Sequence, residues 1–276
     1  MKNQNPHHIH HYHRHMSVSY PVSIRQRLYS LLVYPLLLIA SAFFVLKFLG
    51  GHQATEISGI GWGFIVSAAT ITFTRLLIAY IIALVVAVPL AVLIEINPHA
   101  EKLLLPLFDV MQSVPVLAFF PVVIIFFVHY NLYNSAAIFI LLITMMWSII
   151  FSVVGGLRVI PQDIKAAAKI FNITGFNYLT KVMLPAVFPY IVTGSLLAWA
   201  GGWNIIIVAE VLHTYIPGGS PTQDLFGIGS LLVAASASGQ NKVFLMALVG
   251  LILVVAAMNL FIWQKLLKFA ERFKFE

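Results

Sequence analysis

The chain has 276 residues, of which 61% are hydrophobic and 9% are charged, and it contains no cysteine. This composition excludes an ordinary soluble core and predicts an all-α polytopic membrane protein. The lack of cysteine excludes disulfides, thiolate catalysis and cysteine-ligated metals. The net charge of +7 is compatible with a nucleic-acid partner only if the basic residues form one patch, and their distribution along the chain argues against that.

A polar leader, residues 1–30, precedes the first apolar run, and we interpret it as a disordered cytoplasmic tail. It is rich in histidine, with His7, His8, His10, His11, His13 and His15. Such a tract can bind Ni, Cu or Zn weakly, but a disordered tail is the commoner role, so we assign no metal site to the chain.

Six apolar runs follow, each long enough to cross a bilayer as a helix. We predict spans at Leu31–Leu49, Leu76–Ile94, Leu103–Val128, Ala136–Leu157, Val182–Leu212 and Val243–Leu266. Residues 31–268 then form one transmembrane domain, and residues 269–276 form a cytoplasmic tail. The first run lacks a small-residue cleavage site, so we expect a retained helix rather than a signal peptide.

Two stretches between the spans are too polar or too broken to cross the membrane. Gly50–Phe73 mixes Gly, Thr and Ser with apolar residues, and we expect part of it to form an interfacial helix on the outer face. Tyr215–Gln240 contains a Pro-Gly-Gly-Ser-Pro run and predicts an external loop with short helical pieces.

The basic residues follow this topology. If the N terminus is cytoplasmic, thirteen of the sixteen Lys and Arg residues face the cytoplasm, and only Lys47, Arg75 and Lys242 face outward. This bias predicts that both termini and the Arg158–Lys181 loop lie in the cytoplasm. The basic composition therefore reports orientation in a plasma membrane, and we expect no nucleic-acid partner.

The Arg158–Lys181 loop is a polar, cationic stretch between two predicted spans. Each of its lysines would cost about 2.5–3.5 kcal/mol at the centre of a bilayer. Residues Asp163–Phe171 place Ala and Ile at helical spacing, and Pro161 suits a first helical turn. A surface helix between two spans predicts docking into a groove of a partner, although a solvated connector is the simpler alternative.

This loop resembles the signature of binding-protein-dependent ABC transporter permeases, E-A-A-x3-G-x9-I-x-L-P. Anchored on Leu184-Pro185, the signature aligns the Glu-Ala-Ala triplet with Ala166, Ala167 and Ala168, and its glycine with Asn172. Asparagine tolerates a left-handed backbone, so Asn172 can make the turn that the glycine would make. Ala166 lacks the carboxylate of the family's glutamate, and Asp163, one turn earlier, is a candidate substitute.

The resemblance extends from about Thr74 to Leu212, and it is greatest to the nitrate, sulfonate, taurine and bicarbonate branch of these permeases. The matching residues are Thr74-Arg75-Leu76, Pro89, Asp109, Pro115, Pro121, Gly194, Trp203 and Ala209-Glu210. Ala79, Ala87 and Ala91 stand where that branch usually has glycine, and they keep close helix packing possible.

The family implies a permease of type I (MetI-like) architecture with about six transmembrane helices. In it, the helix after Pro161 is similar to the coupling helix that docks in an ATP-binding subunit. The residues that the resemblance assigns to this role are Asp163, Lys165, Ala166, Ala167, Ala168, Lys169, Asn172 and Pro185. The family also implies a second permease copy, an extracytoplasmic substrate-binding protein and a small anionic substrate.

The chain has no G-x-x-x-x-G-K-[ST] phosphate loop, so we expect ATP and Mg²⁺ to bind to the partner subunit. We therefore expect no cofactor in this chain and no enzymatic activity of its own.

Candidates for the translocation pathway are the polar or helix-breaking residues within the predicted spans. They are Asp109, Gln112, Ser113, Pro115, Thr144, Ser148, Asn204 and Glu210. Pro115 and Pro121 free backbone carbonyls that need a neighbour or a water-filled cavity. The alternative for each polar residue is an ordinary interhelical hydrogen bond. For Asp109 we expect pairing near Arg75 or Gln112, and for Glu210 a helix–helix contact or a gate.

Two other functions are weaker matches to the sequence. A secondary transporter or channel would need no ATPase, but proton or sodium coupling favours ionisable residues near the bilayer midplane, and Asp109 and Glu210 both lie toward predicted helix ends. An intramembrane enzyme would need a nucleophile and a base within the spans, and no such His/Asp/Ser set is present there.

Overall fold

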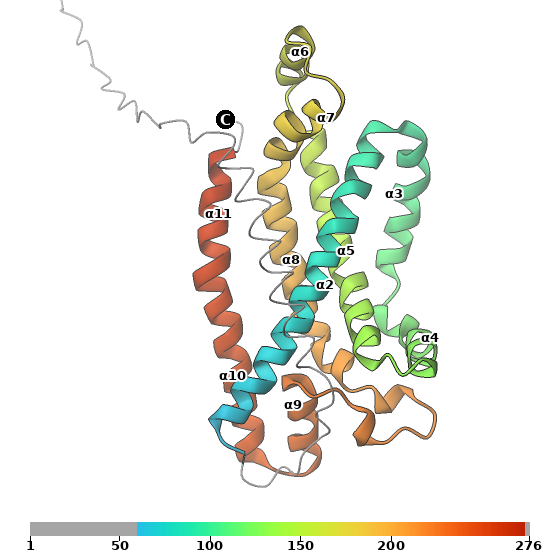
Figure 1. Cartoon of the computed structure of the whole chain (residues 1–276), viewed down its shortest axis with the longest axis vertical. Coiled ribbons are helices and arrows are strands. Elements are labelled where there is room, and N and C mark those ends of the chain that lie inside the picture. Colours follow the sequence, from blue (N-terminus) through green and yellow to red (C-terminus); the bar gives the residue numbers. More distant parts are fainter. Residues whose placement is uncertain (1–59, 274–276) are drawn as a thin grey trace, which may run out of the picture. The chain divides into compact units, whose positions relative to one another are not determined.

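A computed structural model describes residues 60–273, and every regular element in that range is a helix. This confirms the predicted all-α class (Figure 1). The His-rich leader and the predicted span Leu31–Leu49 lie outside the described residues.

Four helical stretches of the described chain are long and apolar enough to cross a membrane. They are α2 (Trp62–Ile96); α5 (Tyr133–Arg158); the run of α7 (Gly175–Tyr178), η1 (Leu179–Met183) and α8 (Leu184–Glu210); and the run of α10 (Asn241–Met258), η4 (Asn259–Trp263), α11 (Gln264–Ala270) and η5 (Glu271–Phe273). A fifth candidate is the bent pair formed by α3 (Pro98–Ser113) and α4 (Val116–His129).

The predicted span Leu103–Val128 is not one straight helix, because α3 and α4 meet at an angle of 91°. The break falls at Val114, whose backbone is extended at φ −77° and ψ 126°. A residue before proline avoids the α-helical region, and Pro115 has no N–H to continue the hydrogen-bond ladder. Pro115 therefore interrupts the helix as predicted, whereas α4 continues through Pro121.

Residues 50–59 of the predicted interfacial stretch Gly50–Phe73 lie outside the described residues, and from Trp62 onward the stretch belongs to α2, which runs without interruption to Ile96. In its first turns, Ile65, Ala68 and Ala69 are buried in one cluster with residues of α9 (Ile228–Ala237) and α10.

The main core joins α2, α5 and α8, with α5 packed against both of the others. Ala79, Ala83, Ala87 and Ala91 recur every four residues along α2 and are fully buried. This confirms the close packing predicted from the alanines. On the other side of α5, Gly194 of α8 lies against Ser148 and Ser152. A Cβ atom added to Gly194 would come within 3.0 Å of both serines, so the two helices are in close contact here.

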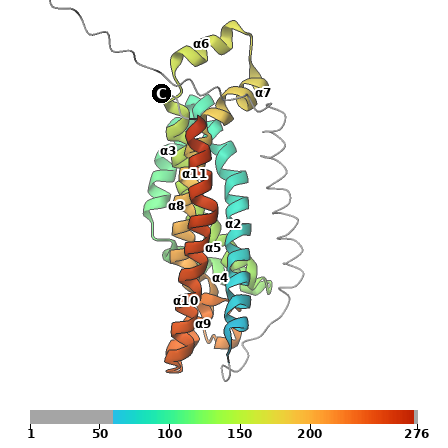
Figure 2. The same cartoon turned by 90° about the vertical axis from the view of Figure 1, so that its left-hand side faces the viewer.

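A second apolar cluster lies at the opposite end of the helices from α6 (Gln162–Ile170), as Figures 1 and 2 show. It contains the first turns of α2, the start of α10, and α9. The predicted short helical pieces of Tyr215–Gln240 are therefore confirmed, as η3 (Pro221–Gln223) and α9. However, α9 is a buried element, since Ile228, Leu231 and Leu232 all pack into this cluster.

Candidate functional site

The helix α6 spans Gln162–Ile170, close to the predicted Asp163–Phe171. Pro161 occupies the cap position before the helix rather than its first turn, and its carbonyl accepts hydrogen bonds from the amides of Ile164 (3.1 Å) and Lys165 (3.2 Å). Asp163 lies in the first turn and Lys169 in the last, so both charges complement the helix dipole.

Asn172 ends α6 with a left-handed backbone, at φ +53°, as the sequence predicted. Its amide donates to the carbonyl of Lys169 (3.0 Å), and the next amide, of Ile173, donates to the carbonyl of Ala168 (2.8 Å). These two bonds form a Schellman motif, the common way of closing a helix C-terminus. The orientation of the chain after α6 therefore depends on one left-handed residue.

Beyond its short connections, α6 projects from the end of the spans (Figures 1 and 2). Ala168 is buried and Ile164 packs against the main core, so one face holds the helix in place. No other part of the described chain covers the C-terminal end of α6, where Ile170 is 81% and Phe171 is 76% exposed. Phe176 of α7 is also 76% exposed. Large apolar side chains at this exposure are a sign of an interaction surface.

The remaining predicted coupling residues are distributed around the same loop. Asp163, Ala166, Lys169 and Asn172 are exposed, Lys165, Ala167 and Pro185 are half-buried, and Ala168 is buried. Pro185 follows the π-helical turn η1 and cannot donate an amide to the carbonyl of Lys181. Their role in coupling stays a prediction.

Two ion pairs lie at this end of the helices. Lys165 Nζ of α6 is 3.6 Å from Glu95 Oε1 in the last turn of α2. Arg158 Nη2, at the end of α5, is 2.5 Å from Glu101 Oε1, at the start of α3. Asp163 was the sequence-based substitute for the family's missing carboxylate, but it is Glu95, on another helix, that pairs with α6. The sequence signal that could have identified Glu95 is its position as an acidic residue at the end of a long apolar run.

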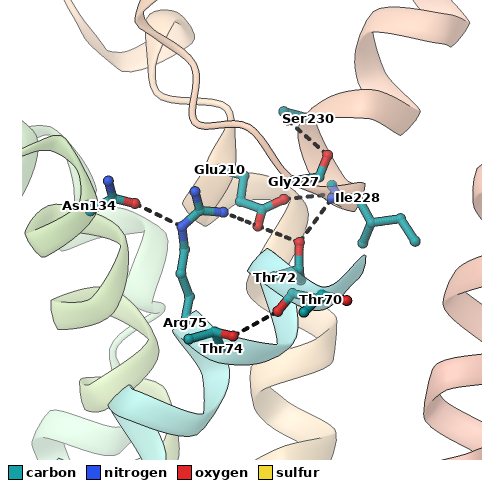
Figure 3. Close-up of polar contacts among 10 residues, drawn as sticks. Thr70, Thr72, Thr74, Arg75, Asn134, Glu210, Gly227, Ile228 and Ser230 are labelled. Carbon is teal, nitrogen blue, oxygen red and sulfur yellow. Dashed lines mark hydrogen bonds and ion pairs between the residues drawn. The ribbon is translucent and has the colours of Figure 1, made fainter. Parts of the chain in front are cut away.

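A buried polar network lies near the other end of the spans, and Figure 3 shows its side chains. Arg75 of α2 is 2% exposed and Glu210, the last residue of α8, is fully buried. Arg75 Nη1 lies 2.6 Å from Glu210 Oε1, and Thr72 donates its hydroxyl to the same oxygen at 2.7 Å. Arg75 Nε also donates to Asn134 Oδ1 of α5 at 2.9 Å.

The same network fixes the segment that leads into α9. The amide of Gly229 donates to Glu210 Oε2 (2.8 Å), and the amide of Ile228 donates to the hydroxyl of Thr72 (2.9 Å). A Cβ atom on Gly227 would overlap the carboxylate of Glu210, so glycine is needed for this close approach. Glu210 is thus the contact between helices that the sequence predicted, with α9 as an additional partner.

Of the two partners predicted for Asp109, the structure shows Gln112, whose Nε2 donates to Asp109 Oδ1 at 3.0 Å, whereas Arg75 is engaged by Glu210 and Asn134. One expectation about a charged residue needs correction. Arg75 is not a charge of an outer loop. It lies inside α2 in a buried ion pair, so it should not be counted among the loop charges that indicate which side of the membrane a loop faces.

The predicted pathway residues fall into separate groups. Asp109, Gln112 and Ser113 occupy the exposed last turns of α3, just before the break at Pro115. On α5, Thr144 and Ser148 are half-buried, and the Thr144 hydroxyl donates to the carbonyl of Ile140 (2.9 Å). On α8, Asn204 is exposed whereas Glu210 is buried. The described chain therefore does not bring all of these residues together, and a common pathway lining stays a prediction.

Comparisons with known proteins agree with this architecture. Residues 83–272 match the family model described as binding-protein-dependent transport system inner membrane component. The chain is 32% identical over 185 residues to the nitrate import permease protein NrtB of Leptolyngbya laminosa, covering 67% of this chain and 62% of that protein. It is 33% identical over 160 residues to the bicarbonate transport system permease protein CmpB of Synechococcus elongatus, covering 58% of this chain and 55% of that protein.

A more distant relative has a different named substrate. The glycine betaine/proline betaine transport system permease protein ProW of Escherichia coli is 26% identical over 210 residues, which cover 71% of this chain and 57% of that protein. In each of these three comparisons the matched region spans less than two thirds of the relative's length. The family match, in contrast, covers more than half of the present chain, and the helical spans fit it. The chain is therefore a multi-pass membrane protein of the family of binding-protein-dependent transport system inner membrane components.

Proposed function

We propose that the chain is the permease subunit of an ATP-driven importer and that α6 is its coupling helix. The observation that carries this proposal is the exposed apolar end of α6 and α7, formed by Ile170, Phe171 and Phe176. Exposure of these side chains to water is unfavourable, by about 25 cal/mol for each Å² of apolar surface that a partner could cover. A groove in a soluble subunit would cover them.

The way α6 is held supports a mechanical role. Ile164 and Ala168 face the protein, the Schellman motif at Asn172 fixes the following turn, and α7 leads directly into the span that contains α8. A short helix that is rigidly closed and attached to spans at both ends can transmit a displacement of its partner to the membrane helices. ATP and Mg²⁺ would bind to that partner.

The remaining subunits follow from the same proposal. A second copy of the permease would complete the translocation pathway, because the candidate residues are dispersed in one protomer. An extracytoplasmic substrate-binding protein would deliver the substrate, with both permease termini in the cytoplasm. The relatives named for nitrate and bicarbonate support a small oxoanion, of the nitrate, sulfonate or bicarbonate class, as the substrate.

Capture of partners from native membranes tests the assembly. We expect an ATP-binding subunit to copurify with this chain, and native mass spectrometry to give two copies of each. The double variant Ile170→Ser/Phe171→Ser should lose the ATP-binding subunit while its membrane abundance stays unchanged. Tyr130→Ser is the matched control, because Tyr130 is an exposed aromatic residue (59%) in the connection between α4 and α5.

Two results would contradict the proposal. The first is retention of the ATP-binding subunit by the Ile170→Ser/Phe171→Ser variant at the wild-type level. The second is transport by proteoliposomes that contain this chain alone, driven by a proton or sodium gradient without ATP, which would identify a secondary transporter. For the substrate, calorimetry on the copurified binding protein should show binding of nitrate, taurine or bicarbonate, and not of glycine betaine.

A further inference from the structure

The connection between α6 and α2 is not made by the backbone. Along the chain, α6 follows α5 through the residues 159–161 and leads through α7 and η1 into α8. A displacement of α6 therefore reaches α5 and α8 through covalent links. In contrast, α2 ends at Ile96, more than sixty residues earlier in the sequence, although it packs in the same core as α5.

The link to α2 is the ion pair between Lys165 and Glu95. The nitrogen and oxygen atoms are 3.6 Å apart, and the two side chains are only 27% and 22% exposed. Partly buried charges are screened by salt much less than exposed ones. Glu95 thus lies where the end of α2 meets α6.

The position of Glu95 is unfavourable for α2 alone. It lies in the last turn of the helix, where the dipole is negative and where α2 has no basic residue of its own. A carboxylate there is destabilising unless a cation from elsewhere compensates for it. Lys165 supplies that cation. A residue that opposes its local preference and is compensated by a distant element is the kind of position at which a function is expected.

We infer that Glu95 is a positioning residue that ties the coupling helix α6 to the membrane helix α2 through Lys165, so that the two move together. This inference rests on the proposed function. The pair places a carboxylate of α2 beside the first half of α6. The connection of α6 to α2 thus uses one side chain from each helix, Lys165 and Glu95.

Charge variants of the reconstituted complex test this. The measured quantity is substrate transported per ATP hydrolysed. Glu95→Gln and Lys165→Gln should each lower this ratio by about three- to tenfold without lowering the melting temperature of the permease. The exchanged pair Glu95→Lys/Lys165→Glu should restore at least half of the wild-type ratio. Glu101→Gln is the matched control, because its pair with Arg158 is 44–48% exposed, and it should change the ratio less than twofold.

Because the chain has no cysteine, a cross-link between two introduced cysteines can test whether α6 and α2 move together or are only in contact. The variant Glu95→Cys/Lys165→Cys should have a low ratio when reduced, and bridging its thiols with a short bifunctional reagent should restore it. Loss of ATP hydrolysis and transport on bridging would mean that α6 moves relative to α2, which overturns the inference.

The outcomes also distinguish the inference from the proposed function. If wild-type chain captures no ATP-binding subunit, both fail. If the wild-type complex couples transport to hydrolysis but Glu95→Gln and Lys165→Gln both match it, only the link through Glu95 is refuted.

Discussion

Arg75 and Glu210 are 135 residues apart in the sequence, yet Arg75 Nη1 lies 2.6 Å from Glu210 Oε1 and neither side chain is accessible to more than a trace of solvent. Each oxygen of the carboxylate is satisfied, one by Arg75 and Thr72 and the other by the amide of Gly229. The pair joins the end of α8 to α2 and to the start of α9. It is therefore the polar centre of the end of the molecule opposite to α6.

Removal of one member of this pair should be strongly destabilising. In the variant Glu210→Gln, or in Arg75→Met, one buried charge is left without its partner, which typically costs about 3–5 kcal/mol. We expect a lower melting temperature of the detergent-purified permease and a lower membrane abundance. The control Glu101→Gln, in an exposed pair, should change stability by less than about 1 kcal/mol. Equal melting temperatures for Glu210→Gln and Glu101→Gln would contradict this assignment.

Two adjacent glycines of α5 should respond in opposite ways to the same substitution. A Cβ atom on Gly156 would collide with the ring of Tyr190 in α8, whereas one on Gly155 meets nothing within 4 Å. Gly156→Ala should therefore cost about 1–3 kcal/mol through forced repacking. Gly155→Ala should be neutral or stabilising by up to about 1 kcal/mol, because alanine restricts the unfolded chain. Thermal unfolding of both variants in detergent measures the difference, and equal effects would refute the contact.

The left-handed turn at Asn172 should be essential for coupling. In Asn172→Val a β-branched residue at φ +53° is strained by about 1–3 kcal/mol and would reorient the chain after α6. We expect loss of substrate-stimulated ATP hydrolysis in the reconstituted complex at normal membrane abundance. Asn172→Gly should keep full activity, because glycine adopts this conformation freely. Full coupling in Asn172→Val would show that the segment is a simple connector.

The predicted orientation can be read from single cysteines. Asn177 and Ser220 are both exposed; Asn177 lies at the start of the span Gly175–Glu210, and Ser220 lies in the loop that follows its end. In intact cells, an impermeant thiol reagent should label Ser220→Cys but not Asn177→Cys, since the basic loop is retained on the cytoplasmic side. Permeabilisation should make Asn177→Cys reactive. Labelling of Asn177→Cys before permeabilisation would reverse the topology.

Much of the fold follows from short-range features of the sequence. Apolar length locates the spans, and it is a local feature of the sequence. The packed alanines of α2 and the left-handed turn at Asn172 were expected from the resemblance to the permease family, in which glycines stand at these positions.

The remaining features depend on contacts between distant segments. Pro115 predicts an interruption, but not the 91° angle between α3 and α4, which the surrounding packing determines. The first turns of α2 are buried in one cluster with residues of α9 and α10. The partners of Arg75 and Lys165, respectively Glu210 and Glu95, come from other helices, and their spacing in the chain carries no signal of the contact.

The uninterrupted course of α2 has a mechanical consequence. With 35 residues it is about 52 Å long, well above the hydrocarbon thickness of about 30 Å, and it belongs to both apolar clusters. Pro89 cannot donate an amide to the carbonyl of Val85, so the helix can bend there, close to its Glu95 end. A tilt of about 10° of the whole helix as one rod would displace its far end, at the surface formed by α9 and the first turn of α2, by about 9 Å.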